Sequence, residues 1–492
     1  MTSLGKSARS PAASSSGSRW KLPKWRAFSA IAITFITIVF ATAFTFLSLP
    51  RIADDFEVTL SAVGWVVIIE SLIIAALLLP LGGLGDLLGD KLILSVGIAI
   101  FGIGTLFTGL SPSFALLIGA RIVMAIGNAL TQSVATGMVV SLFPGEERGL
   151  AMGAQTAAVA VGSASAPLLG GIGLEVLSWK TIFLILLVPT ALSFVAVRAL
   201  IPDEPLRDAK NSRSFDLPGS VLSAIVITAL VVTISNPFSI PWLSPTIIGS
   251  AIATLIVLAL FIRWELATEH PMFELRLFSD SVFRTAVTMR GFGFLASATT
   301  TLLLPIFLLS FRQVSAIAAG VIIAGAAVGL GTGAQISGRM YDRIGPRTPT
   351  LVGLGLQVAV SLGFAVSTDA TPLVIVGLAA AIGGIGIGMW NVPNNSAMLG
   401  AMPPAFLGVG GAFTNVTRTI GTVVGQAIAT AVVAGVMVSR GFDIPLNELR
   451  DNPAAGLVFN DGWRVAYLLS AGLSAALIVV ATRLPGGDTA RS

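Results

Sequence analysis

Two ionisable residues lie deep inside long apolar segments, where an ion is costly and usually has a function. Glu70 falls within the apolar segment 61–81, and Arg121 falls within the segment 114–139. Both segments are predicted to begin on the same side of the molecule. At 1.5 Å of rise per helical residue, both side chains lie at similar depth, roughly 10–14 Å from that end of their helices. We therefore expect Glu70 and Arg121 to form an ion pair, in which the carboxylate is able to bind and release a proton.

Two interpretations of Glu70 stay open at this point. Burial and a neighbouring arginine act in opposite directions on the proton affinity of a carboxylate. A change in either would switch the protonation state of Glu70 and make it a proton carrier. Alternatively, Glu70 belongs to a static buried ion pair, or faces a water-filled vestibule without coupling to anything.

The second part of the chain holds two more arginines in apolar segments, Arg290 and Arg418. Together with Arg121 they make an excess of cations over Glu70, which suits an anionic substrate or a lipid headgroup. Arg290 lies about six residues into its segment, so its head is alternatively able to extend to the nearby membrane surface. Further candidates for lining a cavity that takes an amphipathic solute are polar or aromatic: Trp390, Asn391, Asn394 and Asn415.

The elements that must position these residues are apolar segments of about 20 residues, long enough to cross a membrane as helices. We predict fourteen of them, near 27–49, 61–81, 91–110, 114–139, 149–172, 180–201, 217–234, 244–262, 284–310, 315–337, 348–367, 372–399, 408–438 and 463–483. The predicted fold is therefore an all-α polytopic membrane protein. Its parts are a basic tail (1–26), a six-helix bundle (27–201), two linking helices (217–262), a second six-helix bundle (284–483) and a short tail (484–492).

Composition excludes several classes of function. The 492 residues are 54% hydrophobic and only 11% charged, unlike a soluble domain. The net charge of +5 is spread over short loops, which argues against a nucleic-acid partner. Cysteine is absent and His270 is the single histidine. No nucleophile–base pair, metal-ligand cluster or phosphate-binding loop is present, so we expect neither an enzyme nor a bound cofactor or metal.

The distribution of basic residues predicts the orientation. Residues 1–26 carry lysines and arginines but no acid, and the loops on the same predicted side hold most of the other basic residues. Basic residues favour the cytoplasmic side. We therefore expect a multi-pass protein of the cell membrane with both termini in the cytoplasm.

A short motif, G-x-x-x-D-x-x-G, occurs twice, each time between two apolar segments. The first copy contains Gly82, Asp86, Gly89 and Lys91, and the second contains Gly338, Asp342, Arg343, Gly345 and Arg347. A repeat of this kind indicates two related membrane halves. The aspartate is able to cap a neighbouring helix and pair with a basic residue. Such contacts would hold one end of the bundle shut.

Both copies resemble the G-x-x-x-D-R-x-G-R-R signature that follows helix 2 in the major facilitator superfamily, although Leu87 and Asp90 replace basic positions. Other segments are similar to the 14-helix drug:H⁺ antiporters of that superfamily. Residues 121–127 resemble R-x-x-Q-G-x-G, residues 415–421 resemble N-x-x-R-x-x-G, and residues 270–278 resemble the tract before helix 9. The antiporter signature G-x-x-x-G-P-x-x-G-G is matched by Gly162, Pro167, Gly170 and Gly171.

The resemblance implies the major facilitator fold, with two pseudo-symmetric six-helix bundles and two extra central helices. It also implies proton-coupled export of amphipathic small molecules or drugs by alternating access, in a monomer. One departure matters, because the acidic position of the family's helix 1 is Ala41 here. Either the proton site has moved to Glu70 or proton coupling has been lost. The alternatives are a translocase for a lipid, glycolipid or anionic metabolite, and a membrane scaffold that transports nothing.

Overall fold

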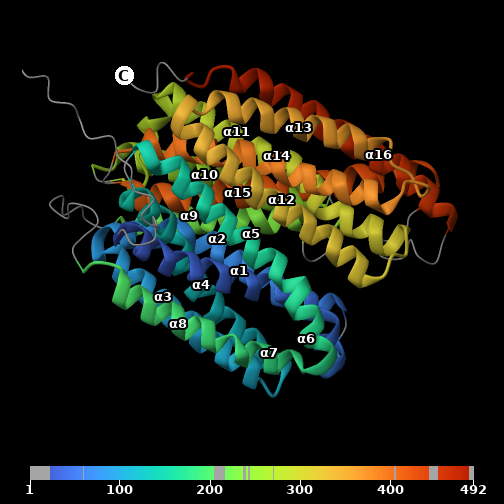
Figure 1. The fold of residues 1–492 in the computed structure, drawn as a ribbon, viewed down its shortest axis with the longest axis horizontal. Coiled ribbons are helices and arrows are strands. Elements are labelled where there is room, and N and C mark those ends of the chain that lie inside the picture. The colour runs from blue at the N-terminus through green and yellow to red at the C-terminus, as the bar shows by residue number, and fades with distance from the viewer. Residues whose placement is uncertain are drawn as a thin grey trace, which may run out of the picture.

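The computed structural model describes residues 23–58, 60–143, 145–203, 216–236, 240–241, 244–269, 271–403, 406–442 and 453–486. Within these ranges the chain is helical and has no strand. Fourteen helical segments there are long and apolar enough to cross a membrane, the number predicted from the sequence. Figure 1 shows them running side by side along the long axis of the molecule.

The first half holds six spans. They are α1 (Pro23–Asp55), α2 (Leu60–Leu88), α3 (Asp90–Leu110), α4 (Phe114–Leu142), α5 with α6 (Arg148–Ser165 and Gly171–Val176), and α7 with α8 (Trp179–Ile185 and Leu187–Leu200). Between α5 and α6 the helix widens into a π-helical turn, Ala166–Gly170. Pro167 lies in this turn, and its missing N–H accounts for the change in hydrogen-bond register.

The second half repeats the arrangement. Its spans are α11 (Ser281–Ile306, continued by a π-helical turn to Phe311), α12 (Ala316–Ile344), α13 (Arg347–Ala365), α14 (Leu373–Gly400), α15 (Leu407–Ser439) and α16 (Pro453–Ala481). The two halves meet where α5 packs along α12 and where α2 and α4 pack against α15. These contacts form the seam between the halves.

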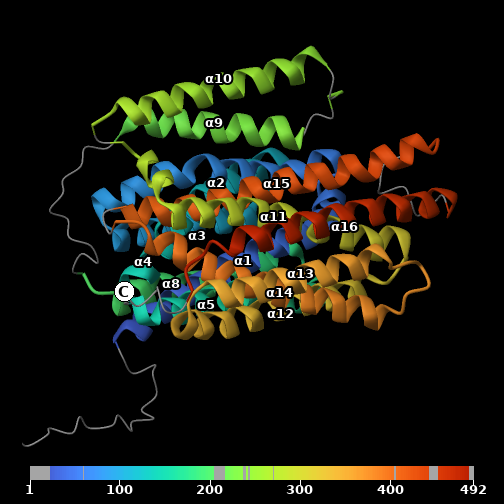
Figure 2. The ribbon, with the colours of Figure 1, turned by 90° about the horizontal axis from the view of Figure 1, so that it is seen from above.

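The two linking helices form a hairpin, α9 (Leu217–Ser235) and α10 (Pro245–Ala267). Helix α9 contacts both α2 and α15, so it covers the seam from outside. Figure 2 shows that α10 is the outer member of the hairpin and lies apart from both halves. A short 3₁₀ helix, Leu275–Ser279, connects the hairpin to α11.

Several helix boundaries differ from the prediction. Helix α1 begins at Pro23, inside the predicted basic tail, because Trp25 is buried against Phe28 and Phe143. Helix α16 begins at Pro453 rather than near 463, and Leu484, assigned to a tail, is buried in the core. Helix α10 extends past 262 to Ala267. These helices continue beyond their apolar segments because residues past the segment still pack against neighbouring residues. A count of apolar residues does not register such contacts.

The repeated motif is mostly helix rather than loop. Residues 82–88 form the last turns of α2, and residues 338–344 form the last turns of α12. The turns themselves lie at Gly89 and Gly345, whose φ angles of 95° and 75° favour glycine. We call the end of the molecule that holds both copies the repeat end. The predicted orientation places it in the cytoplasm.

Candidate functional site

Glu70 on α2 and Arg121 on α4 form a buried ion pair in the first half. Only 3% of Glu70 and 1% of Arg121 are exposed. The second terminal nitrogen of Arg121, Nη1, donates to Met124 Sδ at 3.1 Å, and the guanidinium lies 5.8 Å from the centre of the Phe183 ring. The pairing that similar depth suggested is therefore present, and the aromatic face adds a favourable contact for the cation.

Two neutral side chains complete the surroundings of Glu70. Its Oε1 accepts from Thr42 Oγ1 at 3.0 Å and from Asn128 Nδ2 at 3.4 Å. Thr42 directly follows Ala41, the position where the resemblance leads one to expect an acid. Sequence reasoning did not find Thr42, because threonine is common in apolar helices and carries no signal of its own. In this arrangement, the carboxylate from α2 reaches α1 beside position 41, where the resemblance leads one to expect an acid and Ala41 stands instead.

A row of amides leads from this pair to the second half. Gln132 Nε2 donates to Asn128 Oδ1 at 2.7 Å, and Asn415 Nδ2 on α15 approaches the Gln132 carbonyl oxygen at 3.5 Å. Asn415 Oδ1 in turn lies 3.4 Å from Arg418 Nη2. The last two contacts are long and therefore weak. Nevertheless, polar groups extend from Glu70 across the seam to Arg418, by way of the side chain and then the backbone carbonyl of Gln132.

Arg290 is buried in the second half and does not extend to the membrane surface. Its Nε donates to the Thr414 carbonyl oxygen at 2.7 Å, and its Nη1 donates to Asn391 Oδ1 at 2.8 Å. The guanidinium also lies 5.2 Å from the centre of the Phe294 ring. These contacts connect α11, α14 and α15. They satisfy part of the guanidinium, and no acid of the described residues contacts its charge.

Two of the predicted cavity residues are packed inside the second half. Trp390 is 0% exposed and packs edge-on against Phe294, with ring centres 5.1 Å apart. Asn394 is also 0% exposed and donates from Nδ2 to the Ala286 carbonyl oxygen at 3.0 Å. In this conformation neither side chain is open to a cavity. Asn391, Asn415 and Arg418 are partly exposed instead.

At the repeat end, the second copy of the motif bridges the two halves. The Asp342 carboxylate accepts from the backbone N–H groups of Gly149 at 2.8 Å and Leu150 at 2.9 Å. It thereby caps the start of α5, where free N–H groups favour an anion. Gly338 lies one turn earlier, so close to Gly149 that a Cβ would collide with the Gly149 carbonyl oxygen.

The first copy of the motif makes a close glycine contact between the halves and also hydrogen bonds through a charged side chain. A Cβ at Gly82 would lie 2.9 Å from Ala412 Cβ on α15, so small residues allow the halves to touch here as well. Lys91 Nζ donates to the Ile201 carbonyl oxygen at 2.7 Å and to Asp203 Oδ1 at 2.6 Å. This hydrogen bond and the lysine charge hold the pKa of Asp203 below its usual value. The Asp86 side chain lies outside the described residues.

The remaining motif residues divide into packed and exposed. Arg343 and Arg347 are exposed at the repeat end.

In the antiporter-like segment, a Cβ at Gly162 would lie 2.8 Å from the Ile36 carbonyl oxygen, and one at Gly170 would lie 2.6 Å from Phe44 Cδ2. Those two glycines therefore let α1 approach this segment. Pro167 faces Gly320 of α12, whereas Gly171 has open space around it.

Two buried carboxylates at the repeat end were missed by the sequence reasoning. Asp216 caps α9 by accepting from Gly219 N–H at 2.9 Å, and it accepts from Trp264 Nε1 at 3.0 Å. Glu265 accepts from Phe273 N–H at 2.9 Å. Glu265 is thus a further buried acid within a span, because α10 continues beyond 262. The Asp-Leu-Pro-Gly sequence that begins at Asp216 is a helix-start signal that could have revealed the first of them.

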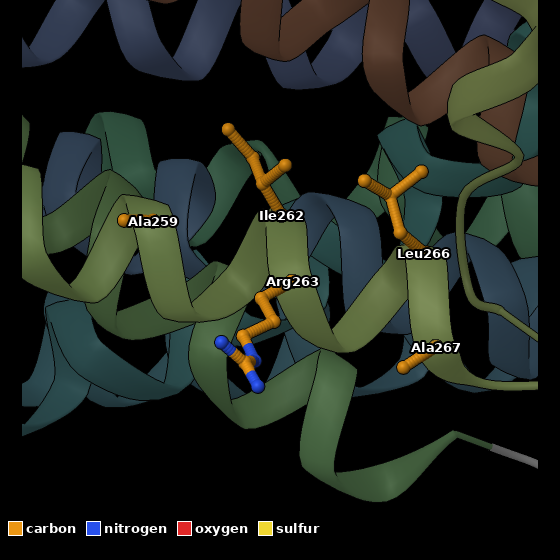
Figure 3. A pocket seen from close by; sticks show the side chains of 5 residues that line it. All are labelled: Ala259, Ile262, Arg263, Leu266 and Ala267. Carbon is orange, nitrogen blue, oxygen red and sulfur yellow. The ribbon is translucent and has the colours of Figure 1, made fainter.

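A surface hollow lies on α10. It is lined by Ala259, Ile262, Arg263, Leu266 and Ala267, all from one helix (Figure 3). Figure 3 shows Ile262 and Leu266 pointing to one side of the helix and Arg263 to the other. No cluster of three or more metal-ligating side chains occurs within the described ranges. The chemistry of the site is therefore that of the Glu70–Arg121 pair, the amide row and the two further arginines.

Known proteins with similar sequences are membrane transporters. The chain is 29% identical to the riboflavin transporter RibZ of Clostridioides difficile over 385 residues, which cover 78% of this chain and 83% of that protein. It is 28% identical to the multidrug resistance protein Stp of Mycobacterium tuberculosis (strain H37Rv) over 389 residues, 79% of this chain and 72% of that protein.

The fold also matches a solved structure. The human organic anion transporter MFSD10 superposes with a TM-score of 0.68 at 14% identity, covering 94% of this chain and all of that one. At that identity the likeness concerns the fold alone. The sequence model of the Major Facilitator Superfamily matches residues 30–426. The chain is accordingly a multi-pass membrane transporter that belongs to the major facilitator superfamily, with multidrug resistance proteins among its relatives.

Proposed function

We propose that the protein is a proton-coupled exporter of amphipathic organic molecules that works by alternating access. The observation that carries the proposal is the buried Glu70–Arg121 pair with its row of amides to Asn415. A carboxylate in such surroundings is sensitive to any change in its partners. Because the row ends on the other half, movement of the halves would alter the surroundings of Glu70.

The moving parts in this proposal are the two six-helix halves, which rock about the seam. In the present arrangement the repeat end is held together by the Asp342 cap and by close approach at Gly82 and Gly338. Protonation of Glu70 would weaken its attraction to Arg121 and favour a rearrangement. We place the repeat end and both termini in the cytoplasm, so that protons enter from outside as the solute leaves.

Transport in proteoliposomes with an imposed pH gradient tests the proposal. Rhodamine 123, an amphipathic dye, should accumulate against its gradient, and a protonophore should abolish the accumulation. Glu70→Gln should reduce gradient-driven uptake at least tenfold. Glu175→Gln removes an exposed carboxylate at the end of α6 and serves as the matched control. Gradient-driven uptake that persists in Glu70→Gln would exclude Glu70 as the proton carrier.

The substrate panel should include riboflavin, because the relative RibZ is a riboflavin transporter. Translocation of a lipid, glycolipid or anionic metabolite is a second candidate function, favoured by the two arginines of the second half. A scaffold without transport activity would move no member of the panel. The three functions are therefore separated by the same preparation.

A further inference from the structure

Two guanidinium groups of the second half lie beside one turn of α15. Arg290, from α11, donates to the carbonyl oxygen of Thr414. Arg418 follows Thr414 by one helical turn, so both lie on the same face of α15. The Arg290 guanidinium therefore lies about one helical turn along α15 from the residue that carries the second guanidinium. Among the residues that the structure describes, neither guanidinium contacts a carboxylate.

Several N–H donors of this pair have no acceptor within the part of the chain that the structure describes. A guanidinium carries five N–H groups. Arg290 uses Nε and Nη1, and its Nη2 makes no hydrogen bond to a described residue. Among the described residues, Arg418 makes only the long contact to Asn415, and its buried Nε has no acceptor there. Unpaired donors away from water are costly, and more so on a charged group. An acceptor from outside the protein would therefore be bound favourably.

The contrast with the first half identifies the charge of that acceptor. Arg121 is neutralised by Glu70, so the first half presents no net charge at its ion pair. Arg290 and Arg418 present two positive charges instead. Two like charges in a medium of low dielectric destabilise each other, and one anion between them reverses the sign of the interaction. A carboxylate, sulfonate or phosphate also matches the fork of N–H groups that a guanidinium presents.

The position of the pair is suited to a transported molecule. Asn415, less than one turn before Arg418, contacts the Gln132 carbonyl oxygen on α4 of the first half. Arg418 is therefore beside the seam rather than in the interior of the second half. It is partly exposed, whereas Arg290 behind it is buried. In this arrangement Arg418 would contact the bound anion directly, and Arg290 would add a second positive charge behind it.

We propose that Arg290 and Arg418 bind an anionic group on the transported molecule. The inference rests on the proposed transport function and states that amphipathic organic anions are among the molecules it carries. The anionic group belongs either to a soluble aromatic acid or to a lipid headgroup, and the chemistry of recognition is the same. The bonds of Arg290 to α14 and α15 also support the packing of the second half, but packing gives no reason for the charge of Arg418.

A pair of dyes with the same ring system tests the charge preference. Fluorescein is an anion and rhodamine 123 a cation, and both are built on xanthene. Initial rates of uptake into proteoliposomes should be measured for the native chain, Arg418→Gln and Arg418→Lys. Arg440→Gln, at the exposed end of the same helix, is the matched control. A third arm follows fluorescent phosphatidylglycerol, an anionic lipid, and phosphatidylcholine, which is zwitterionic, across the bilayer.

The proposal predicts that the native chain transports fluorescein, and that Arg418→Gln raises its KM at least tenfold. Arg418→Lys should retain part of that affinity, and Arg440→Gln should behave as the native chain. Movement of phosphatidylglycerol with the same dependence on Arg418, in place of fluorescein, would support the inference and identify a lipid as the source. Equal losses for fluorescein and rhodamine 123 in Arg418→Gln, or no change for either anion, would overturn it. Transport of rhodamine 123 alone would leave the exporter standing and refute the anion site.

Discussion

The Asp342 carboxylate on α12 accepts hydrogen bonds from the N–H groups of Gly149 and Leu150 on α5, and so joins the two halves at the repeat end. The donors are N–H groups of the first turn of α5, which have no acceptor within their own helix and lie where the helix dipole favours an anion. Because the acceptor comes from the other half, the bonds exist only while the repeat end is closed. We expect this helix cap to act as a latch between the two halves.

Removing this cap should favour opening of the repeat end. Loss of a cap costs about 0.5–2 kcal/mol, so Asp342→Ala should shift the equilibrium towards the open arrangement by roughly 2- to 30-fold. The chain has no cysteine, so spin labels are readily introduced at exposed positions such as Leu88 and Thr348, one in each half. Double electron–electron resonance should show a new population of longer distances between the two spin labels.

Asp280→Ala is the matched control for that measurement. Asp280 caps α11 by accepting from Phe283 N–H at 2.8 Å, within the second half. Its removal should lower stability by a similar amount and leave the distance between the labels unchanged. A shift of equal size in both variants would mean that the Asp342 cap is a stabilising contact with no special effect on the seam.

Close approach at Gly338 should be required for closing. A valine there would place its side chain against the Gly149 carbonyl oxygen, so we expect Gly338→Val to fold and to lose transport at least tenfold. Gly355→Val on α13 is the control, because no atom lies within 4 Å of a Cβ at that position. Size-exclusion chromatography reports folding and dye uptake reports transport. Native-like transport by Gly338→Val would show that the halves do not need this contact.

The fold and part of the site were predictable from the sequence, for identifiable reasons. Apolar length alone gives the spans, because a helix is the structure that satisfies its backbone inside a bilayer. The Glu70–Arg121 pair followed from two equal depths, since an isolated ion there would be costly. The bonds of Asp342 across the seam were expected only as a type of contact, and the motif did not identify α5 as the capped helix.

Contacts that rest on neutral side chains were not predictable in this way. Thr42 and Gln132 belong to residue types that occur in many membrane helices without a role, so their positions beside Glu70 and Asn415 depend on helix rotation. Helix rotation is set by packing of small residues, for example between Gly411 on α15 and Gly137 on α4. The burial of Trp390 has the same cause. The sequence pattern predicts that a helix is present, but it does not predict which side chains of other helices that helix contacts.

The orientation can be checked with single cysteines. Ser279 lies exposed just before α11 at the repeat end, and Ser439 lies exposed at the opposite end of α15. If basic residues fix the orientation as expected, a membrane-impermeant maleimide added to intact cells should label Ser439→Cys and spare Ser279→Cys. Permeabilised cells should label both. The reverse pattern would place the repeat end outside and invert the proposed direction of transport.

The pH dependence of transport should not come from Asp203. Lys91 lowers the pKa of the Asp203 carboxyl, so its contribution to stability is present above the usual value of about 3.9 and is lost only as the pH falls through the lowered value. Between about pH 5.5 and 8 the group stays ionised. Asp203→Asn should therefore leave the pH profile of dye uptake unchanged, and a displaced profile would contradict this assignment.

Removing both members of the Glu70–Arg121 pair should separate folding from coupling. Either single change leaves a buried charge or donor without its partner, which typically costs 3–5 kcal/mol. The double variant Glu70→Gln/Arg121→Gln should lose less than the sum of the two single variants, because neither charge is left unpaired. Melting temperatures of the purified proteins measure the difference.

The same double variant also has a distinct transport phenotype. We expect it to carry rhodamine 123 down a concentration gradient and to ignore an imposed pH gradient, because the seam and its latch are intact while no protonatable group remains at the pair. A variant that is stable and still concentrates the dye in response to a pH gradient would place the proton elsewhere. Asp90, Asp216 and Glu265, the other carboxylates that are buried among the described residues, would then be the next residues to change.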